Sequence, residues 1–364
     1  MLTTPLHAWH QQHDARMVEF AGWDMPVQYS SIVDEHHAVR RNVGLFDISH
    51  MGRLEFRSES AGNFLNRVIT NDTSKMKVGD IRYALVCRED GGILDDVLVY
   101  RLADKWLLVV NASNREKIVG WLKDSNGFAD SGFCDLTQET AMIAVQGPES
   151  GRLMDAFMSE PLTSLGYYKG REAEIAGGPA LISRTGYTGE DGFEVSVPAA
   201  AAVQVWETLV KLGQKSGLKP AGLGCRDTLR LEAAMPLYGH ELTESIDPLT
   251  AGLSFAVKLG KEGFVGKEAL VAIRAAPIGR KRVGLIVDSR RIAREGAAVL
   301  SSDGNSVGEV TSGTFSPTLQ KTIAMAYVND ACSEIGTELQ VDVRGNLLPV
   351  QVTTLPFYKR RSEN

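Results

Sequence analysis

The sequence predicts an α+β fold that is followed by a small all-β domain. Three strands follow one another between residues 81 and 111, and this succession predicts an antiparallel meander. Residues 276–282 read as a linker, because the pattern then changes to short strands separated by turns. We therefore expect residues 1–275 to form a multi-lobed region with two sublobes and antiparallel sheets. Residues 280–364 are expected to form a separate all-β domain.

Each expected element has a local start or stop signal. Ser31 opens a helix with a near capping box completed by Asp34, and Gly44 closes it. Another helix starts after Ser60, and a later one is stopped by Pro236. Further helices are expected at 114–123, 199–215 and 227–235. Turns are expected at 90–91, 103–105, 302–305 and 344–346.

Composition excludes several classes of protein. The chain has 364 residues, 43% hydrophobic, which is enough for a large core and two or three domains. Its formal charge of -6 provides no basic field for nucleic acid or an anionic membrane. No apolar run approaches the roughly 20 residues that span a bilayer. The four cysteines show no Cys-x-x-Cys spacing and no secretory signal precedes them, so we expect reduced thiols and a cytoplasmic protein.

Two adjacent carboxylates lie within a segment of strand-forming residues. Asp95 and Asp96 belong to the stretch 91–100, which is otherwise apolar. Successive side chains of a strand face opposite sides, so each face carries one carboxylate. If Asp90-Gly91 are the two central residues of a hairpin turn, Leu85 pairs with Asp96.

This register gives the two aspartates different neighbours. Asp95 shares its face with Arg82 and Arg88, so we expect it to form a structural ion pair. Asp96 faces apolar and aromatic residues, and a carboxylate desolvated in this way is costly unless something compensates it. A bound ligand would compensate it, and so would backbone amides of a nearby loop. The strand leaves both alternatives open.

The segment 184–194 is a second candidate for a site. Its three glycines allow close approach of the backbone to a ligand, and Tyr187 and Glu194 can then point into a cavity. A merely structural turn is the alternative. Further along, Arg226 at the expected start of a helix is well placed to reach a site, whereas Arg230 fits a salt-bridged helix face better.

Several kinds of catalytic site are excluded by spacing. Gly222-Leu223-Gly224 lacks the third glycine of a dinucleotide-binding turn. The seven histidines show no zinc spacing, so we expect no metal. There is also no phosphate-binding loop, no Gly-x-Ser-x-Gly elbow and no recognisable Cys/His pair. If the protein is an enzyme, the nucleophile belongs to a substrate.

Eight segments, in order along nearly the whole chain, together resemble one family. They are GWDMPVQY at 22–29, GLFDISHMG at 44–52, the strand 91–100, AVQGP at 144–148, the loop 184–194, RDTLRLE at 226–232, TSGTFSPTL at 311–319 and PFY at 356–358. The chain is similar to the T-proteins of the glycine cleavage system, which are tetrahydrofolate-dependent aminomethyltransferases. The resemblance implies a three-lobed architecture with folate in a central cavity and a C-terminal β-barrel. The implied reaction moves a methylene from an aminomethyl group on the lipoyl arm of a carrier, the H-protein, to tetrahydrofolate, and releases ammonia.

The resemblance also implies site residues. Asp96 matches the catalytic carboxylate, and the implied folate-binding residues are Glu194, Arg226, Tyr83, Tyr100, Tyr187, Tyr238, Asn111 and Arg360. Cys225 and His240 depart from the family pattern without removing any of these residues. The chemistry agrees, because tetrahydrofolate brings its own amine nucleophiles and needs only a group that stabilises developing positive charge and moves a proton.

Docking of an acidic carrier on an acidic chain requires a local basic patch. Arg290, Arg291 and Arg294 form the densest candidate, and Arg294 is the predicted docking residue, although a solvated charge run is the alternative. Two other functions remain open. One is a folate-binding module without transferase activity, and the other is a folate-dependent demethylase of a small methylated amine or sulfonium compound.

Overall fold

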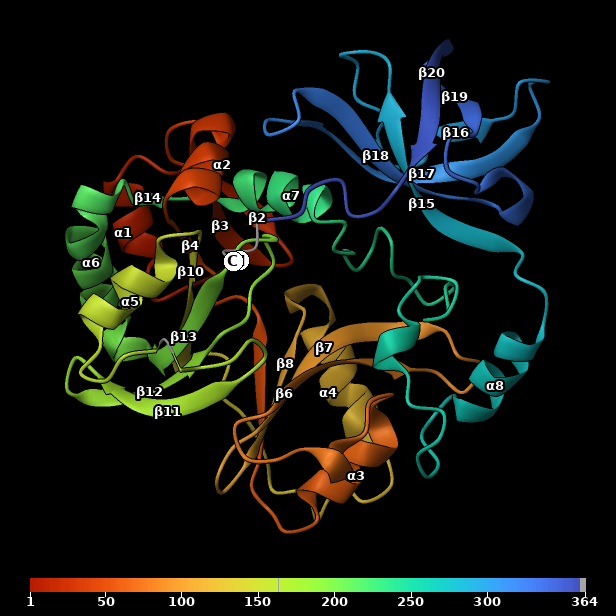
Figure 1. Ribbon diagram of the computed structural model, residues 1–364. Coiled ribbons are helices and arrows are strands. Elements are labelled where there is room, and N and C mark those ends of the chain that lie inside the picture. Colours follow the sequence, from red (N-terminus) through yellow and green to blue (C-terminus); the bar gives the residue numbers. More distant parts are fainter. Residues whose placement is uncertain (163, 361–364) are drawn as a thin grey trace.

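The computed structural model describes residues 1–162 and 164–360. Figure 1 shows three lobes arranged around a common centre, with α7 (Leu223–Glu232) close to that centre. Two lobes are mixed helix and sheet, and the third is a closed barrel of six strands. This arrangement confirms the predicted fold class. Among the described residues, no helix is both long and apolar enough to cross a membrane.

The first lobe is built on a six-stranded sheet. Its strand order is β11 (Gly170–Ile175), β12 (Gly178–Ser183), β13 (Gly192–Pro198), β10 (Thr140–Gln146), β4 (Gly44–Asp47) and β14 (Lys219–Pro220). Its helices are α1 (His7–Gln12), α2 (Ile32–Arg41), α5 (Ser150–Phe157) and α6 (Ala202–Gly213). A small sheet of β1 (Leu2–Thr3), β3 (Trp23–Gln28) and β2 (Arg16–Phe20) lies beside it. The core of this lobe centres on Trp206, which is fully buried.

The second lobe contains the predicted meander. Its strand order is β6 (Ile81–Cys87), β7 (Ile93–Arg101), β8 (Trp106–Val110), β5 (Gly52–Phe56) and β9 (Phe133–Asp135), and β6, β7 and β8 are antiparallel neighbours. Helices α3 (Ala61–Val68) and α4 (Arg115–Asp124) contribute to the same apolar core as the sheet. The three-strand succession expected between residues 81 and 111 is therefore confirmed.

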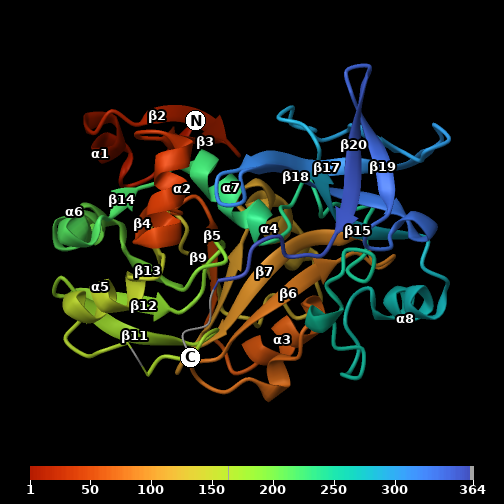
Figure 2. The same cartoon turned by 45° about the horizontal axis from the view of Figure 1, so that its top comes forward.

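The third lobe is the barrel, reached through α8 (Lys267–Ala275). It closes in the order β15 (Arg280–Val287), β18 (Lys321–Asn329), β17 (Ser306–Ser316), β16 (Ala298–Leu300), β19 (Glu338–Val343) and β20 (Asn346–Thr353). Closure leaves the sheet without free edges. Figure 2 shows the turn between β19 and β20 projecting away from the other two lobes.

The predicted register at Asp96 is confirmed, but the turn is different. Leu85 pairs with Asp96 as expected. The amide of Arg88 donates to the carbonyl of Gly92, so the loop has three residues, and a bulge follows between Val86 and Cys87. The longer loop and the bulge shift the register by one residue in opposite senses. Their effects cancel at Asp96.

Two predicted helix limits were wrong. The helix capped by Ser31 ends at Arg41, and Gly44 instead begins β4, where an added Cβ would lie 2.2 Å from Cγ2 of Val39. The helix expected at 227–235 is α7, which starts at Leu223 and ends at Glu232. Pro236 does not stop it, because Ala234 already leaves the helical region with a φ of 54°.

Candidate active site

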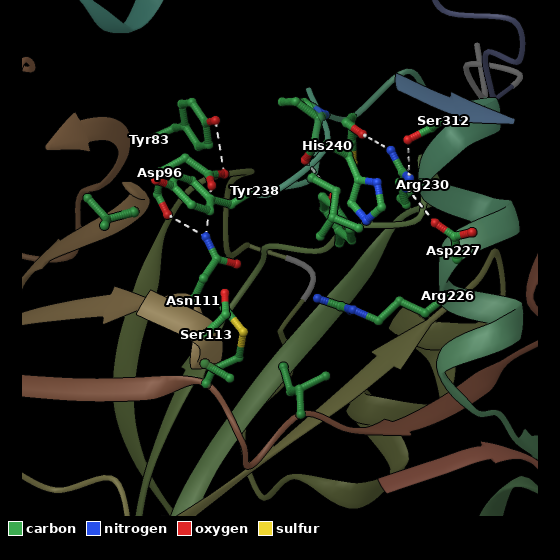
Figure 3. A pocket seen from close by; sticks show the side chains of 18 of the residues that line it. Tyr83, Asp96, Asn111, Ser113, Arg226, Asp227, Arg230, Tyr238, His240 and Ser312 are labelled. Atoms are coloured by element: carbon green, nitrogen blue, oxygen red, sulfur yellow. Dashed lines mark hydrogen bonds and ion pairs between the residues drawn. The ribbon is translucent and has the colours of Figure 1, made fainter. Parts of the chain in front are cut away.

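A cavity of about 970 Å³ lies where the three lobes meet. The first lobe contributes Phe20 and Glu194, the second contributes Asp96, and Arg294 comes from the barrel lobe. Arg226 on α7 lines it as well. The volume is at the upper end of the range for small-molecule sites. Figure 3 shows a group around Asp96 on one side of the space and a group around Arg226 on the other.

Asp96 lies on β7 and holds two hydrogen bonds from the protein. The hydroxyl of Tyr83 donates to its Oδ2 at 3.0 Å, and the amide of Asn111 donates to its Oδ1 at 2.8 Å (Figure 3). No described cation forms an ion pair with it. Desolvation raises the pKa of the Asp96 carboxyl above its usual range, against the lowering effect of these hydrogen bonds. Asp96 can therefore take up and return a proton near neutral pH.

Asp95 is not the ion-pair member that the register suggested. It is fully buried and accepts three hydrogen bonds, from the backbone N–H of Asn111 at 3.0 Å and from the amides of Asn111 at 2.8 Å and Asn114 at 2.6 Å. Residues of the turn after β8, rather than an arginine, therefore bind this carboxylate. Burial raises the pKa of Asp95, and the neighbouring Asp96 raises it further.

The two arginines expected beside Asp95 bind elsewhere. Arg82 donates to the backbone carbonyls of residues 72 and 75. Arg88 lies past the bulge, whose extra residue is Leu94 of β7, is half exposed, and pairs with Asp90 and Glu244. A strand pattern gives the face on which a side chain starts but not the loop to which a long side chain reaches.

Glu194 and Arg226 form the opposite side of the cavity. Glu194 on β13 is buried and accepts a hydrogen bond from the hydroxyl of Thr185 at 2.5 Å. Desolvation raises the pKa of its carboxyl. The guanidinium of Arg226 lies 4.8 Å from the ring centre of Tyr187, and its buried Nη1 has no hydrogen-bond partner among the described residues. An unpaired buried donor is costly, so this nitrogen is available to a ligand acceptor.

Three of the four predicted tyrosines line the cavity. They are Tyr83, Tyr187 and Tyr238, whose hydroxyl donates to the carbonyl of Ile93 at 3.1 Å. Tyr100 does not line it. Its ring is fully buried behind Glu194, where both residues border a much smaller void, and its hydroxyl lies 3.5 Å from Oγ of Ser183. Tyr100 and Asp96 share a face of β7, but at Tyr100 the first lobe packs against this face.

Of the remaining predicted residues, some line the cavity and one does not. Asn111 and Arg294 line the cavity. Arg360 is not among the lining residues: it is exposed, forms a 3.3 Å ion pair with Asp191, and lies over the ring of Tyr167. His240, one of the two departures from the family pattern, lines the cavity 3.1 Å from the carboxylate of Glu295.

His50 and Tyr168 are among the residues of the cavity wall that sequence reasoning missed. His50 follows β4, is buried, and has an Nδ1 without a described partner. Burial and the nearby charge of Arg226 lower its pKa to about 3, so it is neutral. It lies within the segment 44–52 that carries the resemblance, which is a signal that could have identified it. Tyr168 lies in an irregular segment with no comparable signal. No group of described His, Cys, Asp and Glu side chains is arranged to hold a metal ion.

Two family models together match nearly the full chain. Residues 6–261 match the family described as the GCVT N-terminal domain, and residues 280–359 match the glycine cleavage T-protein C-terminal barrel domain.

Individual relatives cover both of these regions. An aminomethyltransferase of Streptomyces avermitilis is 48% identical, with 98% of each chain covered. One from Symbiobacterium thermophilum is 45% identical, with 98% of this chain and 97% of the relative covered. The crystal structure of glycine cleavage system aminomethyltransferase T from Bartonella henselae superposes with a TM-score of 0.92 at 35% identity, over 99% of both chains.

Proposed function

Since the chain belongs to the glycine cleavage T-protein family, and is an aminomethyltransferase, we propose that its central cavity binds tetrahydrofolate as the one-carbon acceptor. The donor is an aminomethyl group on the dihydrolipoyl arm of a carrier H-protein. The observation that supports this most directly is Asp96, a carboxylate with no counter-ion among the described residues, on the wall of a cavity that also holds Glu194 and Arg226.

The reaction balances without a protein nucleophile. The methylene carbon forms two new bonds, one to each of two folate nitrogens. Its bond to the lipoyl sulfur and its bond to the amino group break. The products are 5,10-methylenetetrahydrofolate, ammonia and the free dihydrolipoyl thiol. The two protons lost by the folate nitrogens are taken up by the leaving sulfur and the leaving amine.

Asp96 is proposed to stabilise the positive charge that develops on the methylene unit and to take up a proton from a folate nitrogen. Asn111 and Tyr83 fix its two oxygens, so the carboxylate need not reorganise as charge develops. The carboxylate and the cavity wall thus form a preorganised site for a cationic transition state.

The folate ring is proposed to bind at the opposite side. Glu194 is placed to accept from the amino and ring N–H donors of the pterin, while Nη1 of Arg226 meets an acceptor atom. Tyr187 and Tyr83 supply apolar surface. Arg360 lies outside the cavity wall, so any role for it would concern a part of the ligand that leaves the cavity.

The activity is tested by ammonia release from purified protein, tetrahydrofolate and aminomethylated H-protein, with each component left out in turn. Release that requires all three supports the proposal. Release that does not depend on tetrahydrofolate would refute folate as the acceptor.

Folate binding is tested separately by calorimetric titration. Glu194→Ala should weaken tetrahydrofolate binding by about 1 to 3 kcal/mol, because buried pterin donors lose their acceptor. Glu174→Ala is the matched control, since Glu174 is exposed on β11 of the same sheet. Equal affinities in the two variants would remove Glu194 from the site.

A further inference from the structure

Tyr168 holds a backbone conformation that is rare for an aromatic residue. Its φ is 56°, in the left-handed region, and it is the one aromatic side chain among the seven described non-glycine residues with positive φ. A bulky residue in this region is strained and persists only where its surroundings enforce the conformation. Such residues gather at ligand sites, so the strain is a reason to ask what Tyr168 does.

The surroundings of Tyr168 do enforce it. Its N–H donates to the carbonyl of Arg184 at 3.0 Å, and its carbonyl accepts from the N–H of Ile81 at 3.0 Å. The next residue, Lys169, forms an isolated antiparallel bridge with Asp80. The segment thus connects the loop after β12 in the first lobe to the start of β6 in the second lobe. Both lobes hold the backbone on which the tyrosine is mounted.

This backbone places the ring of Tyr168 on the wall of the central cavity. Four tyrosines line that cavity, and three of them use their hydroxyl within the protein. Tyr83 donates to Asp96, Tyr187 to the carbonyl of Pro236, and Tyr238 to the carbonyl of Ile93. The Tyr168 hydroxyl has no hydrogen-bond partner among the described residues. It is therefore the cavity phenol that remains available to a ligand.

The charge around Tyr168 defines the form of that hydroxyl. Partial burial raises the pKa of the phenol, and the nearby charges of Tyr167, Glu194 and Asp96 raise it further. The hydroxyl therefore stays protonated at neutral pH and can donate a hydrogen bond. Tyr168, Glu194 and Asp96 line the same cavity, so this donor lies on the wall of the space in which the folate is proposed to bind.

We propose that Tyr168 is a binding residue of the folate site and that its hydroxyl donates a hydrogen bond to an acceptor atom of the reduced pterin. This inference rests on the proposed function, and it assigns the site a specific donor for the ring.

The test compares two neighbouring tyrosines. Tyr168→Phe removes only the hydroxyl and keeps the ring. Tyr167→Phe is the matched control, because Tyr167 is exposed and does not line the cavity. In calorimetric titration with tetrahydrofolate, Tyr168→Phe should raise Kd about three- to tenfold, the worth of one hydrogen bond, while Tyr167→Phe should leave Kd unchanged. Melting temperatures without ligand should be equal for both variants and wild type, since neither backbone nor packing changes.

The outcomes separate this inference from the function on which it rests. If wild type binds tetrahydrofolate and Glu194→Ala weakens binding, but Tyr168→Phe binds like wild type, the assignment of Tyr168 is overturned and the folate site stands. If wild type binds no tetrahydrofolate, the proposed function itself fails. If both tyrosine variants weaken binding equally, the effect does not come from the cavity hydroxyl, and the assignment is again overturned.

Discussion

Asp95 and Asp96 are adjacent in sequence but have hydrogen-bond partners of different kinds. Asp95 accepts only from amide N–H groups, which cannot accept a proton in return. Asp96 contacts the hydroxyl of Tyr83, an atom that can both donate and accept. A proton shared by this buried pair is therefore better accommodated on Asp96. The residue at the cavity wall is the one that can exchange it.

The pair should make stability depend on pH. Burial raises both carboxyl pKa values in the folded state, so above about pH 4 the folded protein binds more protons than the unfolded chain. More protons on the folded state means that stability falls as pH rises through this window. Below it, both states are protonated and the effect disappears.

Asp96→Asn should therefore abolish most ammonia release, by about 100-fold or more, without destabilising the protein. The variant lacks one ionisable member of the pair. The difference in melting temperature between variant and wild type should therefore favour the variant more at pH 8 than at pH 5. Single-turnover rates and thermal denaturation at both pH values check this. Full activity in the variant would overturn the mechanism.

Asp95→Asn should act in the opposite way on stability. The new amide would face three N–H donors that lose a carboxylate acceptor, which costs about 1 to 3 kcal/mol. Thermal denaturation measures the loss. Since Asn111 bonds both aspartates, some activity should be lost with it, but less than in Asp96→Asn. A variant as stable as wild type would contradict the hydrogen-bond arrangement.

Helix α7 carries two arginines of different kinds, one turn apart. Arg230 is buried and satisfied: it pairs with Asp227 and Glu241 at 2.8 Å each and donates to Ser312 of the barrel at 2.8 Å (Figure 3). This confirms the salt-bridged interpretation of Arg230 and shows that it also joins the helix to the barrel. Arg226, by contrast, has a buried Nη1 to which the described part of the chain offers no hydrogen-bond partner.

Substituting each arginine by methionine should separate these roles. Arg230→Met leaves Glu241 buried without its cation and should cost about 3 to 5 kcal/mol. Arg226→Met should keep stability and lose tetrahydrofolate affinity. Arg230 keeps the pKa of Glu241 below its usual range, so this stabilisation is present above about pH 4.5 and is lost as pH falls. Chemical denaturation at pH 7 and pH 4 should therefore show the larger loss for Arg230→Met at pH 7. Equal stability of the two variants would contradict the assignment.

The first lobe and the barrel are also joined, through α7, by a buried network away from the cavity. His36 on α2 contacts Thr228 of α7 and Thr318 beside the barrel at 2.8 Å each. Glu232 accepts a hydrogen bond from Arg40 at 2.8 Å. His36 and Arg40 together lower the pKa of the Glu232 carboxyl to about 2. The network holds the first lobe, α7 and the barrel together.

The carrier proposed as the donor must reach the cavity from the protein surface. Arg294 is exposed on the cavity wall and forms no ion pair with a described residue. Arg294→Glu should lower the association rate with the H-protein about two- to tenfold at low ionic strength and flatten its salt dependence. Stopped-flow binding at several salt concentrations measures both.

The control for this charge reversal is Arg344→Glu. Arg344 is exposed in the turn between β19 and β20, which projects from the barrel away from the other lobes (Figure 2). The Arg344→Glu substitution changes the net charge by the same amount as Arg294→Glu, but at a distance from the cavity. If both variants slow association equally, only overall charge matters and Arg294 is not a docking residue.

The sequence by itself determined the family, the fold class and the strand that carries Asp96. These depend on local patterns: strand alternation, turn residues and motif order are each encoded within a few residues. Even the register at Asp96 was predicted, although the loop is one residue longer and a bulge cancels the difference. Glu194 and Arg226 were identified in the same way, because the motifs around them are continuous.

Only the tertiary structure decided which side chains meet across the lobes. The partners of Asp95 come from the turn after β8, and Tyr100 is buried behind Glu194 because the first lobe packs over it. Tyr168 reaches the cavity because Ile81 and Arg184, which lie in different lobes, hold its backbone in a strained conformation. Such contacts depend on how separately folded units pack, and no local pattern encodes that packing.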